Sequence, residues 1–557
     1  MAIDVSRLSF SFPDGTTPFS DLSFKAPSGK VTAVVGPNGV GKSTLLQVVA
    51  GQLEPTEGVV SATGSVAYMP QNPGFDDAGS STVGDALALS LPSALRVVRQ
   101  KVEAGYAEPT GPAGLELGDA LDRWGTAGGY EIEGAWDRVC RDALNLGYAE
   151  ARDRPLRSLS GGQRKRVLLG GFLAGGSDHL LLDEPDNFLD LPGKAWLQAE
   201  LAATSRTVLI VSHDRALLSG PIDRIVCIEQ QGGSWVHGGS YTTFPEARRA
   251  RLERLARDLT AWRDEERRLY RHMRVMKQRA ALNDANAPAA RAAETRWAKF
   301  RDAGQPEPPP PEREIKPRFV GSRGGSEVVQ LEGYEVAGLV LPFDLTVCHG
   351  ERVLLLGDNG VGKSSFLRSV AAAFSTVDDG GDAPPGVRFA PAARVAAFSQ
   401  DNQVGLGDGP LLEQLVAAGA FGNGEEARRG LGRYGLAGRA RHQLTELSGG
   451  QQARIQLLLL ERGHPNVLLL DEPTDNLDLD SIAVIEEVLA DLDATQIAIS
   501  HDRTFARLFD RWVMFDADGV IAELPDLDTG LALASTRRAS LVDEASRRRG
   551  IKVLTNL

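Results

Sequence analysis

The feature that most constrains the fold of this chain is a set of four motifs that occurs twice in the same order. The glycine-rich run GPNGVGKST starts at Gly36, and GDNGVGKSS starts at Gly357. LSGGQ, Asp-Glu-Pro and Ser-His-Asp-Arg then follow in each half. These three motifs repeat at an offset of 288 residues, but the glycine-rich runs are 321 apart, so the first half holds 33 extra residues before its LSGGQ. The pattern predicts a tandem duplication of one domain, with an insertion in the first copy.

Short apolar strands precede the motifs in both halves, and helical segments follow them. This alternation predicts an α/β fold with a mostly parallel, twisted sheet in each half, and it places the site at the carboxyl ends of the strands. The strands expected to run into motifs are Val31–Val35, Leu180–Leu182 and Val208–Val211 in the first half, and Val353–Leu356, Val467–Leu470 and Gln496–Ile499 in the second.

The glycine-rich runs fit the phosphate-loop pattern G-x-x-x-x-G-K-[ST] and each follows a predicted strand. Backbone N–H groups wrap a phosphate only where glycine removes the side chain, and the next helix adds the positive end of its dipole. The lysines are expected to reach the β- and γ-phosphates, and Ser43 and Ser364 to ligate Mg²⁺. The predicted nucleotide-binding residues of these loops are Gly36, Asn38, Gly39, Gly41, Lys42, Ser43 and Thr44, and Gly357, Asn359, Gly360, Gly362, Lys363, Ser364 and Ser365.

Two adjacent acids end a predicted strand in each half. Asp183 and Asp471 are placed to hold Mg²⁺ through its water shell, and Glu184 and Glu472 come next, where they can polarise the attacking water as general bases. The alternative is that these acids only cap the next helix. The Asp-Glu-Pro context after both strands favours catalysis.

Histidine and glutamine residues recur near these acids. His213 and His501 each lie 29 residues after the glutamate of their half, which favours a γ-phosphate sensor over a core histidine. Gln71 and Gln400 follow predicted strands and are expected to bind Mg²⁺ and the attacking water. The candidates for stacking on adenine are Phe12 and Tyr334.

LSGGQ beside these loops resembles the ATP-binding-cassette (ABC) ATPases, and the match covers nearly the whole chain. In that family two cassettes pack head to tail and sandwich two ATPs. The resemblance implies two tandem ABC-type ATPase domains and two ATP sites, in which Lys42 faces Ser448 and Gly450, and Lys363 faces Ser160 and Gly162. The residues of the two LSGGQ motifs expected to bind nucleotide are Ser160, Gly161, Gly162 and Gln163, and Ser448, Gly449, Gly450 and Gln451.

A charged segment, Pro245–Arg318, separates the two halves. Positions 252, 255, 259, 262, 266, 269, 273 and 276 are apolar with one exception, Glu266, in the 3-4 spacing of a long helix about 55 Å in length at about 1.5 Å per residue. After a breaker at Leu282–Pro288, in which Asn286 is a candidate N-cap, Ala290, Ala293, Trp297 and Phe300 repeat the spacing. The segment therefore predicts an antiparallel helical hairpin joining the two domains.

The hairpin differs in charge from the rest of the chain. It carries 19 Lys and Arg against 12 Asp and Glu, net +7, whereas the chain has net charge −13 and the remainder therefore −20. A basic rod on an acidic body indicates contact with a polyanion. The alternative is a solvated coiled-coil spacer.

Two cassettes on one chain, joined by such a hairpin, resemble the F subfamily (ABC-F). LDRW at Leu121–Trp124 and GGYE at Gly128–Glu131, within an insertion at about 93–133, also resemble the arm region of that subfamily. Its usual DEPTNHLD reads DEPDNFLD at Asp183–Asp190 and DEPTDNLD at Asp471–Asp478, which leaves the relative rates of the two sites open. The resemblance implies a ribosome partner, with contacts to rRNA and tRNA in the exit-site and peptidyl-transferase region.

The expected domains are residues 1–244, 245–318 for the hairpin, 319–524, and a tail at 525–557. No apolar run of about 18 or more residues exists, the N-terminus has no secretory pattern, and three scattered cysteines match no metal spacing, so a cytoplasmic protein with no membrane segment is expected. The pairing of its own two cassettes implies a monomer.

The leading functional hypothesis is an ATP-driven wedge on the ribosome that protects it from an antibiotic. A housekeeping translation factor acting on stalled or initiating ribosomes is the nearest alternative. The energy subunit of a drug exporter and a DNA-repair ATPase are rivals from other classes. A basic hairpin between fused cassettes argues against the exporter, and the cysteine spacing argues against the zinc sites that are common in the repair enzymes.

Overall fold

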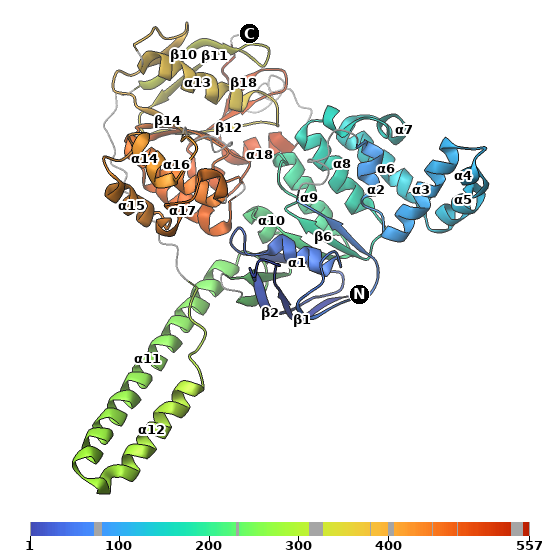
Figure 1. Ribbon diagram of the computed structural model, residues 1–557. Helices are drawn as coiled ribbons and strands as arrows, with labels where there is room; N and C mark the ends of the chain where they lie inside the picture. Colours follow the sequence, from blue (N-terminus) through green and yellow to red (C-terminus); the bar gives the residue numbers. More distant parts are fainter. Residues whose placement is uncertain are drawn as a thin grey trace.

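The computed structural model consists of two α/β units and a long helical hairpin that projects away from both (Figure 1). It describes residues 2–71, 81–229, 233–310, 327–378, 380–398, 406–447, 449–475, 477–535 and 550–555. None of the helices in this part of the chain is long and apolar enough to cross a membrane.

The first unit is built on a six-stranded sheet of order β5-β6-β7-β3-β8-β9, parallel except for its last strand. The central strands are buried on both faces, which explains their unbroken apolar sequences. A smaller antiparallel sheet, β2-β1-β4, and helix α1 cover one face, and helices α8 and α9 cover the other. These elements are β1 (Ile3–Phe10), β2 (Phe19–Ala26), β3 (Val31–Val35), α1 (Lys42–Val49), β4 (Glu57–Ala62), β5 (Val66–Met69), α8 (Gly161–Ala174), β6 (His179–Asp183), α9 (Leu191–Ala203), β7 (Thr207–Val211), α10 (Arg215–Ser219), β8 (Arg224–Ile228) and β9 (Ser234–Gly238).

The second unit repeats this order as β14-β15-β16-β12-β17-β18 and adds β19 at the edge, with β11-β10-β13 as its antiparallel sheet. Two described parts of the expected tail contact the units: β19 pairs with β18 of the second unit, and α18 packs against α9 of the first unit and against β17 and β18 of the second. The boundary expected at 524 leaves out this last strand. The elements are β10 (Glu327–Val336), β11 (Val340–Cys348), β12 (Arg352–Leu356), α13 (Lys363–Asp378), β13 (Val387–Phe389), β14 (Val395–Phe398), α14 (Leu411–Ala417), α15 (Gly424–Arg433), α16 (Gly449–Gly463), β15 (Val467–Asp471), α17 (Leu479–Asp491), β16 (Thr495–Ile499), β17 (Arg511–Phe515), β18 (Ile521–Leu524), α18 (Leu527–Ser535) and β19 (Lys552–Val553).

The insertion of the first half is helical and extends from the first unit, at the right of Figure 1. Trp124 and Trp136 are both buried in a hydrophobic cluster of this helical region. Gly129 lies so close to Trp124 that a Cβ there would sit 2.1 Å from the indole, so the packing requires glycine. The helices are α2 (Val83–Ala88), α3 (Ser93–Ala107), α4 (Pro112–Leu115), α5 (Leu117–Thr126), α6 (Gly129–Leu144) and α7 (Tyr148–Ala151).

The hairpin consists of α11 (Phe244–Leu282) and α12 (Ala287–Asp302), which pack along the apolar spacing read from the sequence. Trp262 stacks on Phe300 with ring centroids 5.5 Å apart. Glu266, the one polar residue of the seam, accepts a hydrogen bond from Trp297 Nε1 at 3.3 Å, which explains how a carboxylate is tolerated there.

The breaker between the two helices lies where the sequence places it, but its capping differs. Asn286 occupies the N-cap position of α12 without a side-chain capping bond, and its Nδ2 donates to Arg279 O at 3.4 Å. Asn283 is the residue whose side chain caps, accepting from Ala285 N at 3.0 Å. Leu282 beside it is 89% exposed.

Candidate functional site

Both phosphate loops have the close backbone packing that requires glycine. A Cβ on Gly36 would lie 2.4 Å from Ile228 O, and one on Gly357 would lie 2.4 Å from Phe515 O. The lysine of each loop folds back on it: Lys42 Nζ donates to Gly36 O at 2.9 Å, and Lys363 Nζ donates to Gly357 O at 2.7 Å. Each loop thus holds a buried ammonium group at the start of a helix, α1 or α13, as a polyphosphate site requires.

A hydroxyl and a carboxylate adjoin each lysine. Ser364 Oγ donates to Asp471 Oδ1 at 2.8 Å, and Ser43 hydrogen-bonds to Asp183. Burial raises the pKa of Asp183 to about 6. Within the described ranges no cluster of three or more His, Cys, Asp or Glu forms a metal cage. One hydroxyl with one carboxylate fits Mg²⁺, which keeps several waters and takes its other ligands from phosphates.

The two candidate bases share an unusual backbone conformation. Glu184 has φ +46° and Glu472 has φ +48°, in the left-handed region that non-glycine residues rarely adopt. The next strand holds each one: Glu184 N donates to Val211 O at 2.9 Å, and Glu472 N donates to Ile499 O at 3.1 Å. Backbone strain of this kind is typical of functional sites, and here it occurs at matching positions of the two halves.

Each candidate histidine lies beside the glutamate of its own unit. His501 N donates to Glu472 Oε2 at 3.1 Å, and its Nε2 lies 3.4 Å from Glu472 Oε1. His213 Nε2 lies 3.9 Å from Glu184 Oε1. Burial, with the charge of Lys42, lowers the pKa of His213 to about 3, and burial likewise lowers the pKa of His501 well below its usual value. Both rings are therefore neutral at physiological pH.

Gln71 also reaches its glutamate: its Nε2 donates to Glu184 Oε2 at 2.5 Å. Its predicted counterpart, Gln400, lies outside the described residues. Gln71 therefore lies against the candidate base, Glu184.

A cavity of 460 Å³ joins the two units around Lys363. Its second-unit wall includes Lys363, Ser364, Glu472 and His501, and its first-unit wall includes Ser160–Gly162 at the start of α8. Ser160 caps that helix by accepting from Gln163 N at 3.2 Å. The structure therefore brings this phosphate loop and the LSGGQ of the other half to one cavity.

The Lys42 side of the interface is described in part. Asn38 N donates to Asp478 Oδ2 at 3.0 Å, so the first phosphate loop also contacts the second unit. Ser448 lies outside the described residues, and Gly450 is buried, where a Cβ would lie 3.0 Å from Ser481 Oγ. The facing of Lys42 with Ser448 and Gly450 stays a prediction.

The two candidates for stacking on adenine differ in exposure. Phe12 is 39% exposed and contacts Phe10 edge-on, so it remains available for stacking. Tyr334 is only 9% exposed, and its hydroxyl donates to Ser369 Oγ at 2.7 Å, so its assignment to adenine is wrong. The tyrosine belongs to the core beneath α13.

Two lysines that no motif marks lie at these sites. Lys165 Nζ donates to Glu184 O at 3.0 Å, and Lys194 Nζ donates to His501 O at 3.3 Å. Burial lowers the pKa of Lys165 to about 8. The sequence held a signal for both lysines, because the equivalent positions of the second half, 288 residues later, are the apolar residues Ala453 and Ile482.

A sequence model of the family described as ABC transporter matches residues 19–187 and 340–475. An antibiotic resistance protein of Mycobacteroides abscessus is 40% identical over 94% of this chain and 98% of its own. ABC transporter F family member 5 of Arabidopsis thaliana is 29% identical over 91% of this chain and 74% of its own.

Among solved structures, one described as a model of ribosome-bound archaeal Pelota and ABCE1 matches with a TM-score of 0.55 at 17% identity, covering 97% of this chain and 85% of that one. That likeness concerns the fold. Paired phosphate loops with strand-end Asp-Glu pairs define the molecule as a two-unit P-loop ATPase. The chain belongs to the ATP-binding-cassette family and, within it, to the ABC-F subfamily.

Proposed function

We propose that the protein binds ATP at two sites between its units, and that the resulting closure sets the α11–α12 hairpin against the ribosome. The hairpin then lies in the exit-site and peptidyl-transferase region, where it contacts rRNA and tRNA and protects the ribosome from an antibiotic. Hydrolysis reopens the units and releases the protein.

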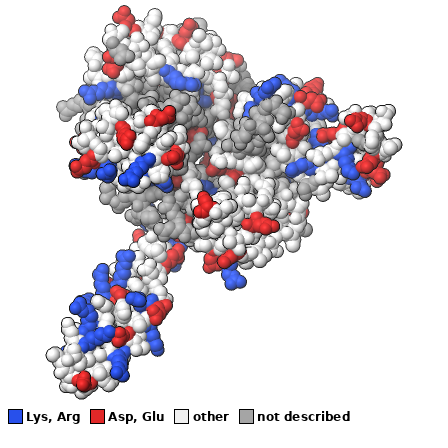
Figure 2. Space-filling model, viewed as in Figure 1, with Lys and Arg blue, Asp and Glu red and all other residues white. Residues whose placement is uncertain are grey.

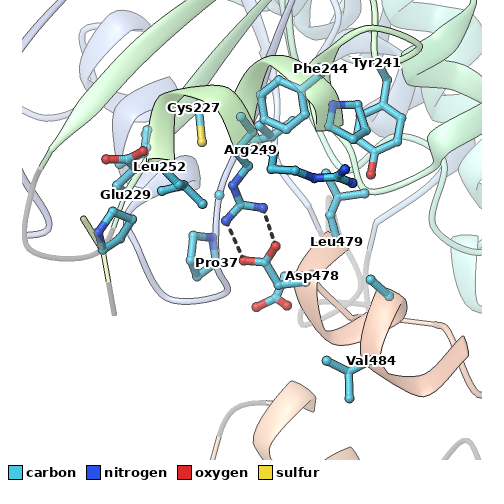
Figure 3. A pocket seen from close by; sticks show the side chains of 18 residues that line it. Pro37, Cys227, Glu229, Tyr241, Phe244, Arg249, Leu252, Asp478, Leu479 and Val484 are labelled. Atoms are coloured by element: carbon cyan, nitrogen blue, oxygen red, sulfur yellow. Dashed lines mark hydrogen bonds and ion pairs between the residues drawn. The ribbon is translucent and has the colours of Figure 1, made fainter. Parts of the chain in front are cut away.

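The observation that carries the proposal is a cavity of 480 Å³ at the base of the hairpin. In Figure 3, Phe244 and Leu252 of α11 lie in one wall, Pro37 of the first phosphate loop in another, and Val484 of α17 in a third. Arg248 of α11 also forms a bidentate ion pair with Asp480 of α17. The hairpin base thus contacts both units next to a nucleotide loop, so a change in their packing shifts the hairpin.

The hairpin surface suits a nucleic acid. Lys and Arg side chains gather along it in Figure 2, while the visible face of the body mixes both signs. Many of these cations are exposed on α11 and α12, and phosphates attract such a row without regard to sequence. The exposed cations nearest the tip are Arg271, Arg274, Lys277, Arg279 and Arg291.

Relatives favour the ribosome and resistance. The similar Mycobacteroides abscessus protein is named for antibiotic resistance, and the similar solved structure contains a ribosome-bound ABC protein. A housekeeping role on stalled ribosomes is the second candidate, because the tip exposes only one large apolar side chain, Leu282, and offers no aromatic group to displace a drug.

The chemistry follows from the site. Lys42 and Lys363 neutralise phosphate charge, and Glu184 and Glu472 hold the attacking water and accept its proton. Neutral His213 and His501 contact the glutamates and sense the γ-phosphate. Mg²⁺ would be held by Ser43 with Asp183 and by Ser364 with Asp471, and when bound it would neutralise charge on the phosphates.

The test is a ribosome-trapping experiment with the double variant Glu184→Gln, Glu472→Gln. With ATP this variant is expected to cosediment with ribosomes, because closure persists when hydrolysis stops. The matched control adds Arg271→Glu, Arg274→Glu and Arg279→Glu, which should release the trapped protein while leaving ATP binding unchanged. A double variant that sediments free of ribosomes with ATP contradicts the proposal.

The antibiotic susceptibility of a host distinguishes the resistance role from the housekeeping role. A host that expresses the protein should gain resistance to a macrolide, lincosamide or pleuromutilin, and the double Glu→Gln variant should confer none. Ribosome trapping without any change in susceptibility would favour the housekeeping role. Copurification with a membrane protein that ribonuclease does not disturb would favour the exporter rival.

A further inference from the structure

We infer that Lys194, a residue of the first unit, is a positioning residue for the ATPase site around Lys363, and that the site around Lys42 works without a counterpart. The inference rests on the two-site function proposed above. It concerns a contact that crosses the interface, from α9 of one unit to the histidine and glutamate of the other.

Lys194 is anchored in its own unit and points out of it. Its Nζ lies 3.1 Å from Asp214 Oδ2, and its side chain is only 16% exposed. Burial acts to lower the pKa of Lys194, but the charges of Asp214 and Asp186 outweigh burial and raise that pKa. The lysine also lines the cavity that contains Lys363 and Glu472, so a charged ammonium from the first unit reaches the second unit's site.

The ammonium acts on the backbone that aligns the base. Lys194 Nζ donates to His501 O at 3.3 Å, and His501 N in turn donates to Glu472 Oε2 at 3.1 Å. The same histidine contacts the phosphate loop, since its Nε2 lies 3.0 Å from Asn359 Oδ1. One hydrogen bond across the interface therefore restrains a residue that touches both the base and the loop.

The matching position of the other half cannot do this. Asp190 caps α9 by accepting from Gly193 N at 3.0 Å, and Asp478 caps α17 by accepting from Ser481 N at 2.8 Å. The two helices thus begin in the same register, and the residue after each capped position is Lys194 in α9 and Ile482 in α17. Ile482 is 3% exposed in the hydrophobic core and has no donor.

The donor and acceptor belong to different units, so the contact depends on how the units pack. When they separate, His501 loses this restraint while its bonds within the second unit remain. Lys194 thereby makes the second unit's site depend on how the first unit packs against it. Ile482, at the matching position, gives the second unit no such influence over the first unit's site.

The test measures each site alone. In a Glu184→Gln background the remaining turnover comes from the Lys363 site, and Lys194→Met is expected to lower its kcat about tenfold through loss of alignment, with KM for ATP little changed. In a Glu472→Gln background, where the Lys42 site remains, the same substitution should lower kcat much less, because Lys194 adjoins that site through its ion pair with Asp214, the residue after His213. Lys194→Arg should restore most of the loss, and Ile482→Met is the matched control in α17.

Lys194→Met leaves Asp214 buried without its ammonium, so a second variant, Lys194→Met with Asp214→Asn, removes both charges and protects the fold. An equal loss of kcat in both backgrounds by this pair, or a rise in KM without a fall in kcat, would overturn the assignment. If the ATPase rate of neither single Glu→Gln variant exceeds that of the double variant, the proposed two-site function fails instead. The assignment of Lys194 then fails with it.

Discussion

Glu184 and Glu472 occupy matching places in the two units, yet different neighbours hold them. Two amides and a lysine serve Glu184: Gln71 Nε2 at 2.5 Å and Asn187 Nδ2 at 2.7 Å donate to its carboxylate, and Lys165 donates to its carbonyl. All three belong to the first unit. The first candidate base is therefore aligned from within its own unit.

Glu472 has an acid where Glu184 has an amide. Asp475 stands at the position of Asn187, 288 residues on. Burial, followed by the charge of Asp475, raises the pKa of Glu472 to about 8. The hydrogen bond that this carboxylate accepts comes from His501 N, whose carbonyl accepts from Lys194 of the other unit.

The two units share the backbone conformation of this glutamate but not the side chains that support it. The strained backbone of the glutamates is the same in both units, because the next strand holds it. The supporting cations differ: Lys165 matches Ala453, and Lys194 matches Ile482. Both lysines come from the first unit, so one unit supports both candidate bases. We therefore expect the two sites to differ in turnover.

The largest expected effect tests which halves pair at each site. Gly162→Asp places a carboxylate in the cavity around Lys363, where it would repel the γ-phosphate and lower turnover of that site about 100-fold. ATPase rates should therefore fall in a Glu184→Gln background and stay unchanged in a Glu472→Gln background. Gly176→Asp, at an exposed glycine with open space around it, is the folding control. Loss in the Glu472→Gln background instead would mean that the pairing is reversed.

A smaller effect compares how much of the turnover depends on each candidate base. Because its carboxylate is aligned by two amide donors, Glu184 should carry most of the turnover at pH 7. Glu184→Gln is expected to lower steady-state ATPase about tenfold, and Glu472→Gln only by about a tenth. Phosphate release at saturating ATP measures both. Equal losses would show that the differing neighbours have no consequence for rate.

Lys165→Met tests the support within the first unit. The substitution removes the donor to the carbonyls of Glu184 and Gln71, which lie 3.0 and 3.2 Å from Nζ. In a Glu472→Gln background kcat should fall about fivefold, as expected for one charged hydrogen-bonding group. Ala453→Met at the matching position is the control, and a loss in the Glu184→Gln background would contradict support within one unit.

Much of this arrangement follows from local sequence. The phosphate loops, the strand-end acids and the breaker of the hairpin are local patterns, and each one predicts its element within a few residues. Elements fixed by distant partners were not predictable. β19 is a strand only because β18 offers its edge, and Tyr334 is buried only because α13 covers it. The contact of Lys194 with the second unit depends on how the two units pack, which no spacing along the chain encodes.

The smallest expected effect comes from exchanging the residues next to the two glutamates, Asn187 and Asp475. Asp475→Asn gives Glu472 the amide that Glu184 has, and it removes the adjacent charge that raises the pKa of this base. The Lys363 site, measured in a Glu184→Gln background, should then turn over about threefold faster at pH 7, since a donor replaces a repelling acid.

Asn187→Asp is the reciprocal change. In a Glu472→Gln background it should slow the Lys42 site by a similar factor, because the amide that donates to Glu184 at 2.7 Å becomes a carboxylate. Opposite signs for the two substitutions mean that this single position accounts for part of the difference between the sites. The same sign for both would place the difference elsewhere and leave the lysines, Lys165 and Lys194, as its cause.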